Sequence, residues 1–421
     1  MTEMQHTTEG MSAKPRIKPA EEGDDRPLSV SARLGRLQFH HSGKFRVLQI
    51  ADIQDGPRVC ADTVSLIAAS LDAVRPDLVV FTGNQIAGYD RAFSGTFTKR
   101  HWSGTNFDNE ALEHTRGLVR KAISQFLKPL TDRHVPFAVT FGNHDFQCGL
   151  SNAELEAIYC EFPGCLNALE GQDGCALLPN QSVMSCAPGT FALPVTDAES
   201  ESVVLGLALL DSGDYARGGG FASPSADALD FLKVLPARMG VKSLVFQHMP
   251  LPQYYDLLQP AAPTVAFAMQ GYSRHAEQYY VLDESKTQPG GYLGEGISCP
   301  DQSGEFEILQ SGFIGVCTGH DHRNGFVGTS QGVLMIATPT CGFGSYGPAP
   351  AKRATRLIEF DIRHPYEPRT QLLQFGDLVG KPSSKKAYIY AMNAKPPQEG
   401  EGDDLLRRPS LWARLSKLLR K

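Results

Sequence analysis

The sequence predicts an α/β fold built around a parallel sheet, and three observations support this prediction. Apolar runs of strand length alternate with segments of helical periodicity, which is the order expected for parallel strands joined by crossover helices. Several of these runs end in polar side chains, as expected where strands leave a sheet at its carboxyl edge. The chain has 421 residues, of which 41% are hydrophobic, so it can bury an extensive core.

The first half of the chain contains the clearest alternation of strands and helices. Strands are predicted at 45–52, 77–83 and 137–141, with a helix-compatible stretch at 62–75 between the first two. A helix is predicted from Glu110 to Arg133, because its apolar residues recur with a period close to 3.6. Residues 90–109 are rich in Gly, Ser, Thr and aromatic residues, and we expect them to form a long excursion.

The second half of the chain continues the sheet. Further strands are predicted at 203–210, 243–247 and 313–318. Antiparallel strands are expected over 325–339 and 353–363, with Gly-rich turns at 342–347 between them. Residues 282–303 are turn-rich and are predicted to form a surface loop.

The two ends of the chain differ in composition from the globular part, which spans 36–380. Residues 1–35 are predicted to be a disordered tail, because few large apolar residues occur there. Residues 381–403 are rich in Pro, Lys and Glu and are predicted to be a linker. Residues 404–421 are predicted to form a basic amphipathic helix, which either makes peripheral contact with a membrane, binds a partner, or docks on the protein's own surface.

Bulk composition excludes some classes of function and indicates a compartment. A net charge of −6 argues against nucleic-acid binding, which favours a basic surface. No signal peptide is visible, and no apolar run reaches the roughly 18 residues of a membrane span, so a cytoplasmic protein is expected. The nine cysteines include no C-x-x-C pair and are expected to be reduced thiols, although a Cys160–Cys165 disulfide stays open.

Five apolar runs carry the candidate chemistry at their ends. The runs are VLQIADIQD (47–55), LVVFTGNQ (78–85), FAVTFGNHD (137–145), SLVFQHMP (243–250) and IGVCTGHDH (314–322). A metal that activates water needs nitrogen and oxygen ligands on a stiff frame, with one position left open. The candidate site residues are Asp52, Gln54, Asn84, Asn143, His144, Asp145, His248, His320 and His322.

Two further carboxylates have alternative interpretations. Asp55 is either a substitute ligand or a turn residue before Gly56 and Pro57, and turn preference favours the second interpretation. Asp211 in LDSGD either orients a ligand or caps a turn.

The series of runs resembles the calcineurin-like metallophosphoesterases, whose motifs are D-x-H, G-D-x-x-x-G, G-N-H-[DE], H and G-H-x-H. It is most similar to the purple-acid-phosphatase-like branch, through LDSGDY (210–215), HMPLP (248–252) and GHDHRN (319–324). The resemblance covers about residues 36–378. It implies a two-sheet α/β sandwich flanked by helices, with the site at the carboxyl ends of the strands.

The resemblance also implies roles for individual residues. Asp52 and His322 would bind a first metal ion, and Asn143, His248 and His320 a second. His144 would protonate the leaving group, with Asp145 orienting its imidazole. The implied activity is hydrolysis of a phosphorylated small molecule or protein by hydroxide bound to divalent Mn, Fe or Zn, with one or two ions.

Two positions depart from the family pattern. Gln54 stands where the family has His, and Asn84 stands where the family has a bridging carboxylate. Two divalent ions about 3.5 Å apart repel by roughly 19 kcal/mol at an effective dielectric constant of about 20, and a neutral amide does not offset this repulsion. A single ion at the second site is therefore expected. The alternative function is a degenerate-site pseudo-enzyme that binds a phosphorylated ligand or a protein partner without hydrolysis.

Overall fold

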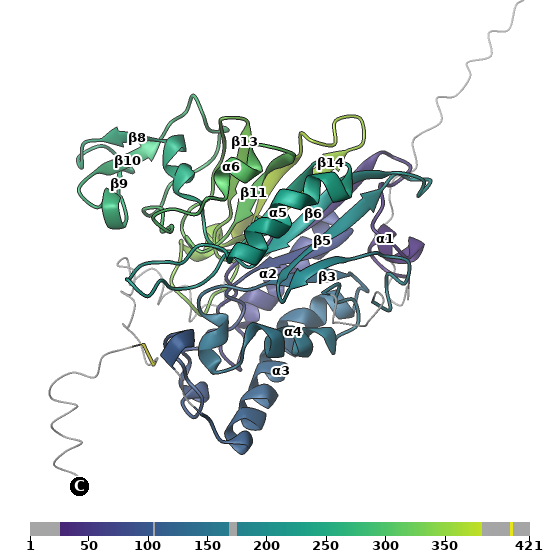
Figure 1. Ribbon diagram of the computed structural model, residues 1–421, viewed down its shortest axis with the longest axis horizontal. Coiled ribbons are helices and arrows are strands. Elements are labelled where there is room, and N and C mark those ends of the chain that lie inside the picture. The colour runs from purple at the N-terminus through teal and green to yellow at the C-terminus, as the bar shows by residue number, and fades with distance from the viewer. Residues whose placement is uncertain (1–25, 104–105, 168–174, 381–404, 407–421) are drawn as a thin grey trace, which may run out of the picture.

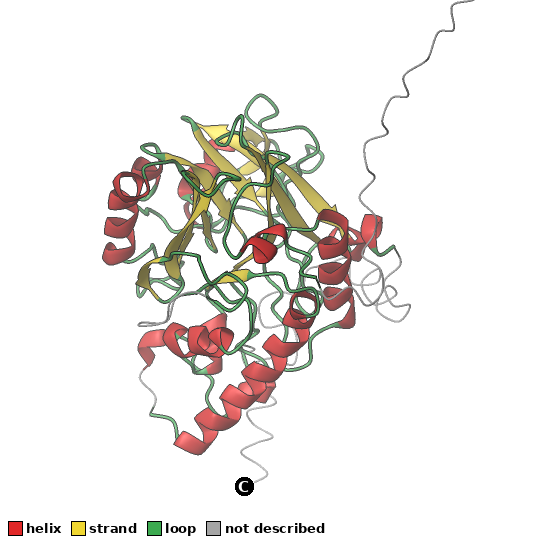
Figure 2. Cartoon of the chain, turned by 90° about the vertical axis from the view of Figure 1, so that its right-hand side faces the viewer, coloured by secondary structure: helices red, strands yellow, loops and turns green. Residues whose placement is uncertain are grey.

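Two mixed sheets packed face to face form the centre of the molecule, with helices on both outer sides (Figures 1 and 2). The computed structural model describes residues 26–103, 106–167, 175–380 and 405–406. The predicted α/β fold with two sheets is confirmed. Within the described ranges, no helix has the length and apolar character needed to cross a membrane.

The first sheet has five strands in the order β15-β14-β1-β2-β3. Its strands are β1 (Lys44–Ile50), β2 (Leu78–Thr82), β3 (Phe137–Thr140), β14 (Ala354–Asp361) and β15 (Arg369–Gln374). β1, β2 and β3 are parallel, as predicted, whereas β14 runs antiparallel to β1. Helices α2 (Ala61–Val74), α3 (Asn109–Thr131) and α4 (Asn152–Cys160) cover the outer face of this sheet.

The second sheet has seven strands in the order β12-β13-β11-β7-β6-β5-β4. Its strands are β4 (Met184–Ala187), β5 (Thr190–Thr196), β6 (Val203–Leu210), β7 (Ser243–Gln247), β11 (Phe313–Thr318), β12 (Val327–Ser330) and β13 (Val333–Ala337). The four central strands, from β6 to β13, are parallel. Helices α5 (Ala226–Met239) and α6 (Phe306–Leu309) and a small sheet of β8 (Leu258–Ala261), β9 (Met269–Gln270) and β10 (Tyr279–Leu282) lie outside it.

Alternate residues of the central strands enter different cores. Val47 on β1 packs in the core between the two sheets, whereas Leu48 and Ile50 pack in the core beneath α2 and α3. Val80 and Phe81 on β2 divide in the same way. Because both faces of these strands are buried, their sequences are continuous apolar runs.

A buried polar contact joins the two sheets close to the ends of their strands. Gln49 on β1 donates from Nε2 to Thr82 Oγ1 (3.1 Å) and to the carbonyl of Thr318 at the end of β11 (3.2 Å). Its Oε1 accepts from Thr338 Oγ1 (2.7 Å). Since donors and acceptors are matched inside the sandwich, this contact fixes the ends of β1, β2 and β11 relative to one another.

One expectation about the chain needs correction. The tail predicted to be disordered ends earlier than expected, because α1 (Val30–Leu34) is capped by Ser29 and tied to Asp77 through Ser31. The antiparallel strands expected over 325–339 and 353–363 are present, since β12 pairs antiparallel with β13, and β14 with β1 and β15. Residues 282–303 form a largely exposed and half-buried loop, as predicted, and Leu293, Ile297 and Cys299 anchor it in the core.

The structure also contains elements that the sequence does not predict, and its cysteines agree with the prediction of reduced thiols. α4, α5, β4, β5 and β15 and the small sheet were not predicted. The predicted linker 381–403 and C-terminal helix 404–421 lie outside the described residues, apart from 405–406. All nine cysteines are free, and the sulfurs of Cys160 and Cys165 lie 3.8 Å apart without a bond.

A buried carboxyl beside β7 gives the fold a testable pH dependence. Glu305 has no exposed surface, and its Oε2 accepts from Gln247 Nε2 at 3.3 Å. The Oε1 atoms of Glu305 and Gln247 are both buried without a hydrogen-bond partner. Burial raises the pKa of Glu305 to about 8, so the folded protein holds this carboxyl in its neutral form at pH 7.

We expect Glu305→Gln to stabilise the protein at pH 8 but much less at pH 5. The pKa of Glu305 is higher in the folded protein than in the unfolded chain. As the pH rises from 5 to 8, the unfolded wild type therefore loses this proton more readily than the folded wild type, and its stability falls. The variant carries no such group. The difference in unfolding free energy between the two proteins should grow by about 2 to 4 kcal/mol from pH 5 to pH 8, as measured by urea denaturation. Parallel pH profiles would contradict this expectation.

Candidate functional site

The loops that follow β1, β2, β3, β7 and β11 meet at one end of the sandwich and bring the predicted site residues together. All nine candidates are at least nine-tenths buried: Asp52, Gln54, Asn84, Asn143, His144, Asp145, His248, His320 and His322. Contacts join residues far apart in the sequence. The backbone N–H of His320 donates to Asp52 Oδ2 (2.9 Å), and His248 Nε2 lies 3.0 Å from Asn143 Oδ1.

The backbone at the site is shaped to hold these side chains close together. Asp52, Gln54, Asn84 and His320 all have φ between 45° and 67°, in the left-handed region that side-chain-bearing residues seldom adopt. Gly83 has φ of 90°, and a Cβ there would lie 2.7 Å from Nδ1 of His248. The glycine therefore lets the imidazole lie directly against the end of β2.

Asp52, Gln54 and His322 form a first cluster of acceptor atoms. His322 Nδ1 donates to the carbonyl of Tyr346 (2.7 Å), and its Nε2 lies 3.3 Å from Asp52 Oδ1. Gln54 Oε1 is buried and has no hydrogen-bond partner, and Asp52 Oδ1 is buried with only this imidazole beside it. Buried acceptors without donors are unfavourable unless a proton or a cation lies among them.

The charge of this cluster is set by competing effects on Asp52. Burial by itself would raise the pKa of Asp52, but the nearby His322 and His248 lower it to about 2. Burial lowers the pKa of His248 and of His320, which disfavours their protonated forms. Asp52 therefore contributes a negative charge that is suited to a cation.

Asn143, His248 and His320 form a second cluster. His248 Nδ1 donates to the carbonyl of Thr82 (2.9 Å), so its Nε2 offers a lone pair toward Asn143 Oδ1, which is also an acceptor. His320 Nδ1 lies 3.2 Å from the same Nε2. This cluster has two imidazoles and one amide oxygen but no carboxylate.

Asn84 adds a hydrogen-bond donor to the second cluster. Its Oδ1 accepts from the backbone N–H of His144 (2.9 Å), which fixes the orientation of the amide. Its Nδ2 therefore faces Asn143 Oδ1 at 3.2 Å. An amide nitrogen of this kind donates a proton and does not bind a cation.

The two clusters differ in how well they fit a metal ion. Within the described part of the chain, no group of three His, Cys, Asp or Glu side chains is arranged to hold an ion, since each cluster has two such side chains and one amide. The first cluster supplies the carboxylate of Asp52 and the unpartnered Oε1 of Gln54. The second faces the donor of Asn84. The geometry therefore favours the first cluster, whereas the sequence had favoured the second.

His144 lies beside both clusters, but Asp145 does not orient it as expected. His144 Nδ1 donates to Oε1 of Gln147 (2.8 Å), and no described residue hydrogen-bonds its Nε2. Burial lowers the pKa of His144 to about 4. The sequence analysis missed Gln147, which lies three residues after His144 in the short turn η3 (Asp145–Cys148), within reach of the ring.

Asp145 instead joins the loops to one another. Its two carboxylate oxygens accept from the backbone N–H groups of Asn84 (2.7 Å), Gly142 (2.8 Å) and Ile86 (2.9 Å). Burial raises the pKa of Asp145 to about 7, although these backbone donors oppose the effect. The residue ties the loop after β2 to the loop after β3.

The two open interpretations of other carboxylates are resolved in favour of turns. Asp55 Oδ2 accepts from the backbone N–H of Cys60 (2.9 Å) ahead of α2, so Asp55 acts as a turn residue. Asp211 accepts from the backbone N–H of Gly213 (3.0 Å) and from Asn152 Nδ2 (2.7 Å).

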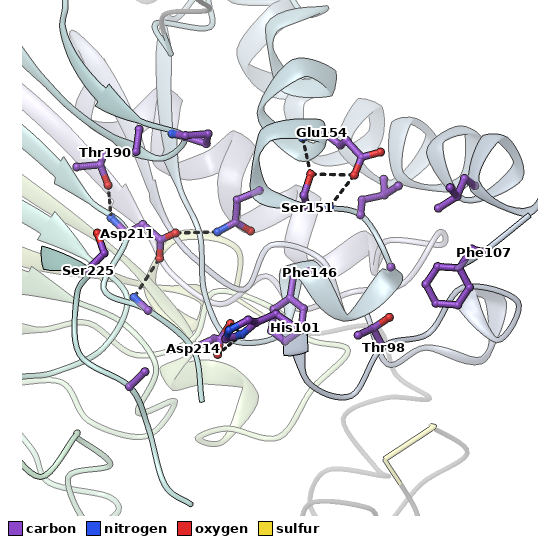
Figure 3. A pocket seen from close by; sticks show the side chains of 18 of the residues that line it. Thr98, His101, Phe107, Phe146, Ser151, Glu154, Thr190, Asp211, Asp214 and Ser225 are labelled. Carbon is purple, nitrogen blue, oxygen red and sulfur yellow. Dashed lines mark hydrogen bonds and ion pairs between the residues drawn. The ribbon is translucent and has the colours of Figure 1, made fainter. Parts of the chain in front are cut away.

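A cavity of about 950 Å³ lies next to the site but is lined by none of the nine candidates (Figure 3). Its walls come from the excursion at 90–109, the start of α4 and the loop after β6. Asp211 and Asp214 contribute carboxylates, and Phe107 and Phe146 contribute aromatic rings. The imidazole clusters lie outside this cavity.

Three known proteins are similar to this chain in sequence. The chain is 22% identical over 380 residues to "Probable inactive purple acid phosphatase 29" of Arabidopsis thaliana, covering 80% of this chain and 82% of that protein. It is 21% identical over 370 residues to "Probable inactive purple acid phosphatase 14" of the same plant, covering 78% of each. It is 25% identical over 335 residues to "Phosphatase DCR2" of Saccharomyces cerevisiae, covering 72% of this chain and 47% of that protein.

A sequence model of one family also matches this chain. The family is described as "Calcineurin-like phosphoesterase", and the match spans residues 45–324. That span includes all five loops of the site and more than half of the chain. The chain therefore belongs to the calcineurin-like phosphoesterase family.

Proposed function

We propose that this chain is a metal-dependent phosphoester hydrolase acting on a phosphorylated small molecule or protein. The observation that carries the proposal is the position of His144, whose Nε2 has no hydrogen-bond partner among the described residues, beside the acceptor cluster of Asp52, Gln54 and His322. A divalent cation held by that cluster supplies Lewis-acid stabilisation of phosphoryl oxygens. Its oxygen and nitrogen ligands suit Mn, Fe or Zn.

Protein side chains would supply the proton for the leaving group and hold the site loops in position. Gln147 holds Nδ1 of His144 as a donor, so that Nε2 is the atom that passes a proton to the leaving oxygen. An adjacent phosphate dianion favours the protonated imidazole and opposes the effect of burial on its pKa. Asp145 and Tyr346 position the loops on which His144 and His322 lie.

A second candidate function is a pseudo-enzyme that binds a phosphorylated ligand or protein without hydrolysis. Asn84 supports it, because its amide places a donor where a second ion would need an oxygen ligand. The two Arabidopsis relatives also carry the word "inactive" in their names.

Replacing His144 by Ala tests the hydrolase proposal through its dependence on the leaving group. The full chain, loaded with Mn, Fe or Zn, is assayed with 4-nitrophenyl phosphate and with phenyl phosphate. We expect His144→Ala to lower kcat about 100-fold or more with phenyl phosphate, whose leaving oxygen needs a proton, and less with 4-nitrophenyl phosphate. His114→Ala, at an exposed position on α3, is the matched control.

The outcomes separate the two candidate functions. Equal turnover by the wild type and His144→Ala, at the level of the buffer alone, would remove the hydrolase. Retained binding of inorganic phosphate by that inactive wild type would then support the pseudo-enzyme.

A further inference from the structure

Two loops meet beside the site and form a wall there. One is the excursion that carries Arg100 and His101, and the other follows β6 and carries Asp214 and Tyr215. His101 Nδ1 lies 2.7 Å from Asp214 Oδ2, and Figure 3 shows these two side chains in contact. The guanidinium carbon of Arg100 lies 3.6 Å from the centre of the Tyr215 ring.

Tyr215 connects this wall to the candidate site. Its hydroxyl accepts from Nδ2 of Asn143 (2.8 Å), and its ring centre lies 6.3 Å from that of His144. Phe221 stacks on Tyr215 at 5.8 Å and meets His320 edge-on at 4.5 Å. The ring of Tyr215 therefore lies against the guanidinium of Arg100 and close to the imidazole of His144.

The positive charge of Arg100 is not neutralised by the described part of the chain. No described carboxylate forms an ion pair with it, and its hydrogen bond goes to the carbonyl of its neighbour Lys99 (3.0 Å). The carboxylate of Asp214, next to Tyr215 in the sequence, is paired with His101. Arg100 is half-buried, so its position is restricted by the wall.

A stacked guanidinium is well suited to bind a phosphate group. Stacking on an aromatic face restricts the side chain while leaving most of its five N–H donors at the ring edges. Those donors match two phosphate oxygens at once. A phosphoester dianion also needs positive charge, and a site without the family's second ion supplies less of it.

We propose that Arg100, held on the ring of Tyr215, binds the phosphoryl oxygens of the substrate and so replaces part of the charge of a second metal ion. This rests on the proposed function only in that the site receives a phosphorylated ligand. Arg100 is a binding residue here, whereas Tyr215 positions it.

The test measures binding of inorganic phosphate to the full chain by calorimetry, in the presence of Mn²⁺, for the wild type and Arg100→Gln. The expected result is a dissociation constant at least tenfold higher in the variant. Arg100→Lys should recover part of the loss, because it keeps the charge but not the paired donors. Arg217→Gln is the matched control, since Arg217 lies in the same wall, is exposed and is 5.8 Å from the Trp102 ring. Circular dichroism verifies that each variant is folded.

Kinetics with phenyl phosphate distinguish this proposal from the proposed function. If the wild type turns over, Arg100→Gln should raise KM about tenfold and change kcat by less than about threefold. If Arg100→Gln had the same turnover and the same phosphate affinity as the wild type, the role of Arg100 would be overturned and the hydrolase proposal would stand. Phosphate binding that depends on Arg100 in a protein without turnover would support Arg100 and remove the hydrolase. Wild-type protein that binds no phosphate would overturn the proposal for Arg100.

Discussion

The double substitution Gln54→His with Asn84→Asp is expected to raise the metal content from at most one ion per chain to two. It should also raise the rate with 4-nitrophenyl phosphate at least about 100-fold. The first change adds an imidazole nitrogen beside Asp52 and His322. The second adds a negative charge where Asn84 now points Nδ2 at Asn143. That charge offsets the mutual repulsion of two close cations, which no neutral group does.

The same double variant should respond to metal in its stability, which gives a readout independent of turnover. In the wild type, Asn84 Nδ2 donates to Asn143 Oδ1, whereas a carboxylate would place two acceptors at that 3.2 Å contact. Without metal the variant should lose about 1 to 3 kcal/mol of unfolding free energy, and with Mn²⁺ it should exceed the wild type.

Elemental analysis after dialysis and thermal melts in EDTA or Mn²⁺ check both expectations for the double variant. The two single variants are the controls and should show intermediate metal uptake. A double variant that takes up no more metal and loses activity would show that the amides belong to a working arrangement of their own.

Arg353→Leu is expected to destabilise the protein by about 3 to 5 kcal/mol and to weaken metal binding about tenfold or more. Arg353 is 1% exposed and donates to the carbonyls of Gly342 and Ser345, the second at 2.8 Å. The variant leaves the carbonyl of Ser345 without this donor and the carbonyl of Gly342 with only the long contact from Thr340 Oγ1 (3.5 Å). The loop that they belong to also carries Tyr346, whose carbonyl accepts from His322 and whose ring stacks on it at 4.1 Å.

Tyr346→Phe is the matched control for Arg353→Leu. It keeps the backbone carbonyl and the stacked ring, so it should change stability and metal affinity little. Urea denaturation and calorimetric titration with Mn²⁺ measure the two effects separately. If Arg353→Leu lost stability but bound Mn²⁺ as tightly as the wild type, the link between this loop and His322 would be contradicted.

Much of the fold was predictable because the central strands are buried on both faces. Runs such as 78–82 admit few alternatives when they are followed by a polar loop. Helix α5 was missed although Ser225 caps its start and Gly240 ends it, since Pro236 interrupts its pattern. The edge strands β4 and β15 alternate buried and exposed positions weakly and gave little signal.

That the nine candidates lie close together was predictable, but the hydrogen bonds among them were not. Each candidate follows a strand, and parallel strands of two packed sheets bring such positions together. The orientation of Asn84 depends on the backbone N–H of His144, 60 residues away, which no local pattern reveals. The family resemblance implies that Asp145 orients His144, yet three backbone N–H groups hold its carboxylate.

The left-handed backbone at four residues of the site lowers the stability of the folded protein. These residues are Asp52, Gln54, Asn84 and His320. Each such residue costs of the order of 1 kcal/mol, which glycine would avoid. Folding alone gives no reason to keep four side chains in this conformation at a single end of the sandwich. These four conformations together lower the free energy of unfolding by several kcal/mol, a cost that a ligand bound by the four side chains would offset.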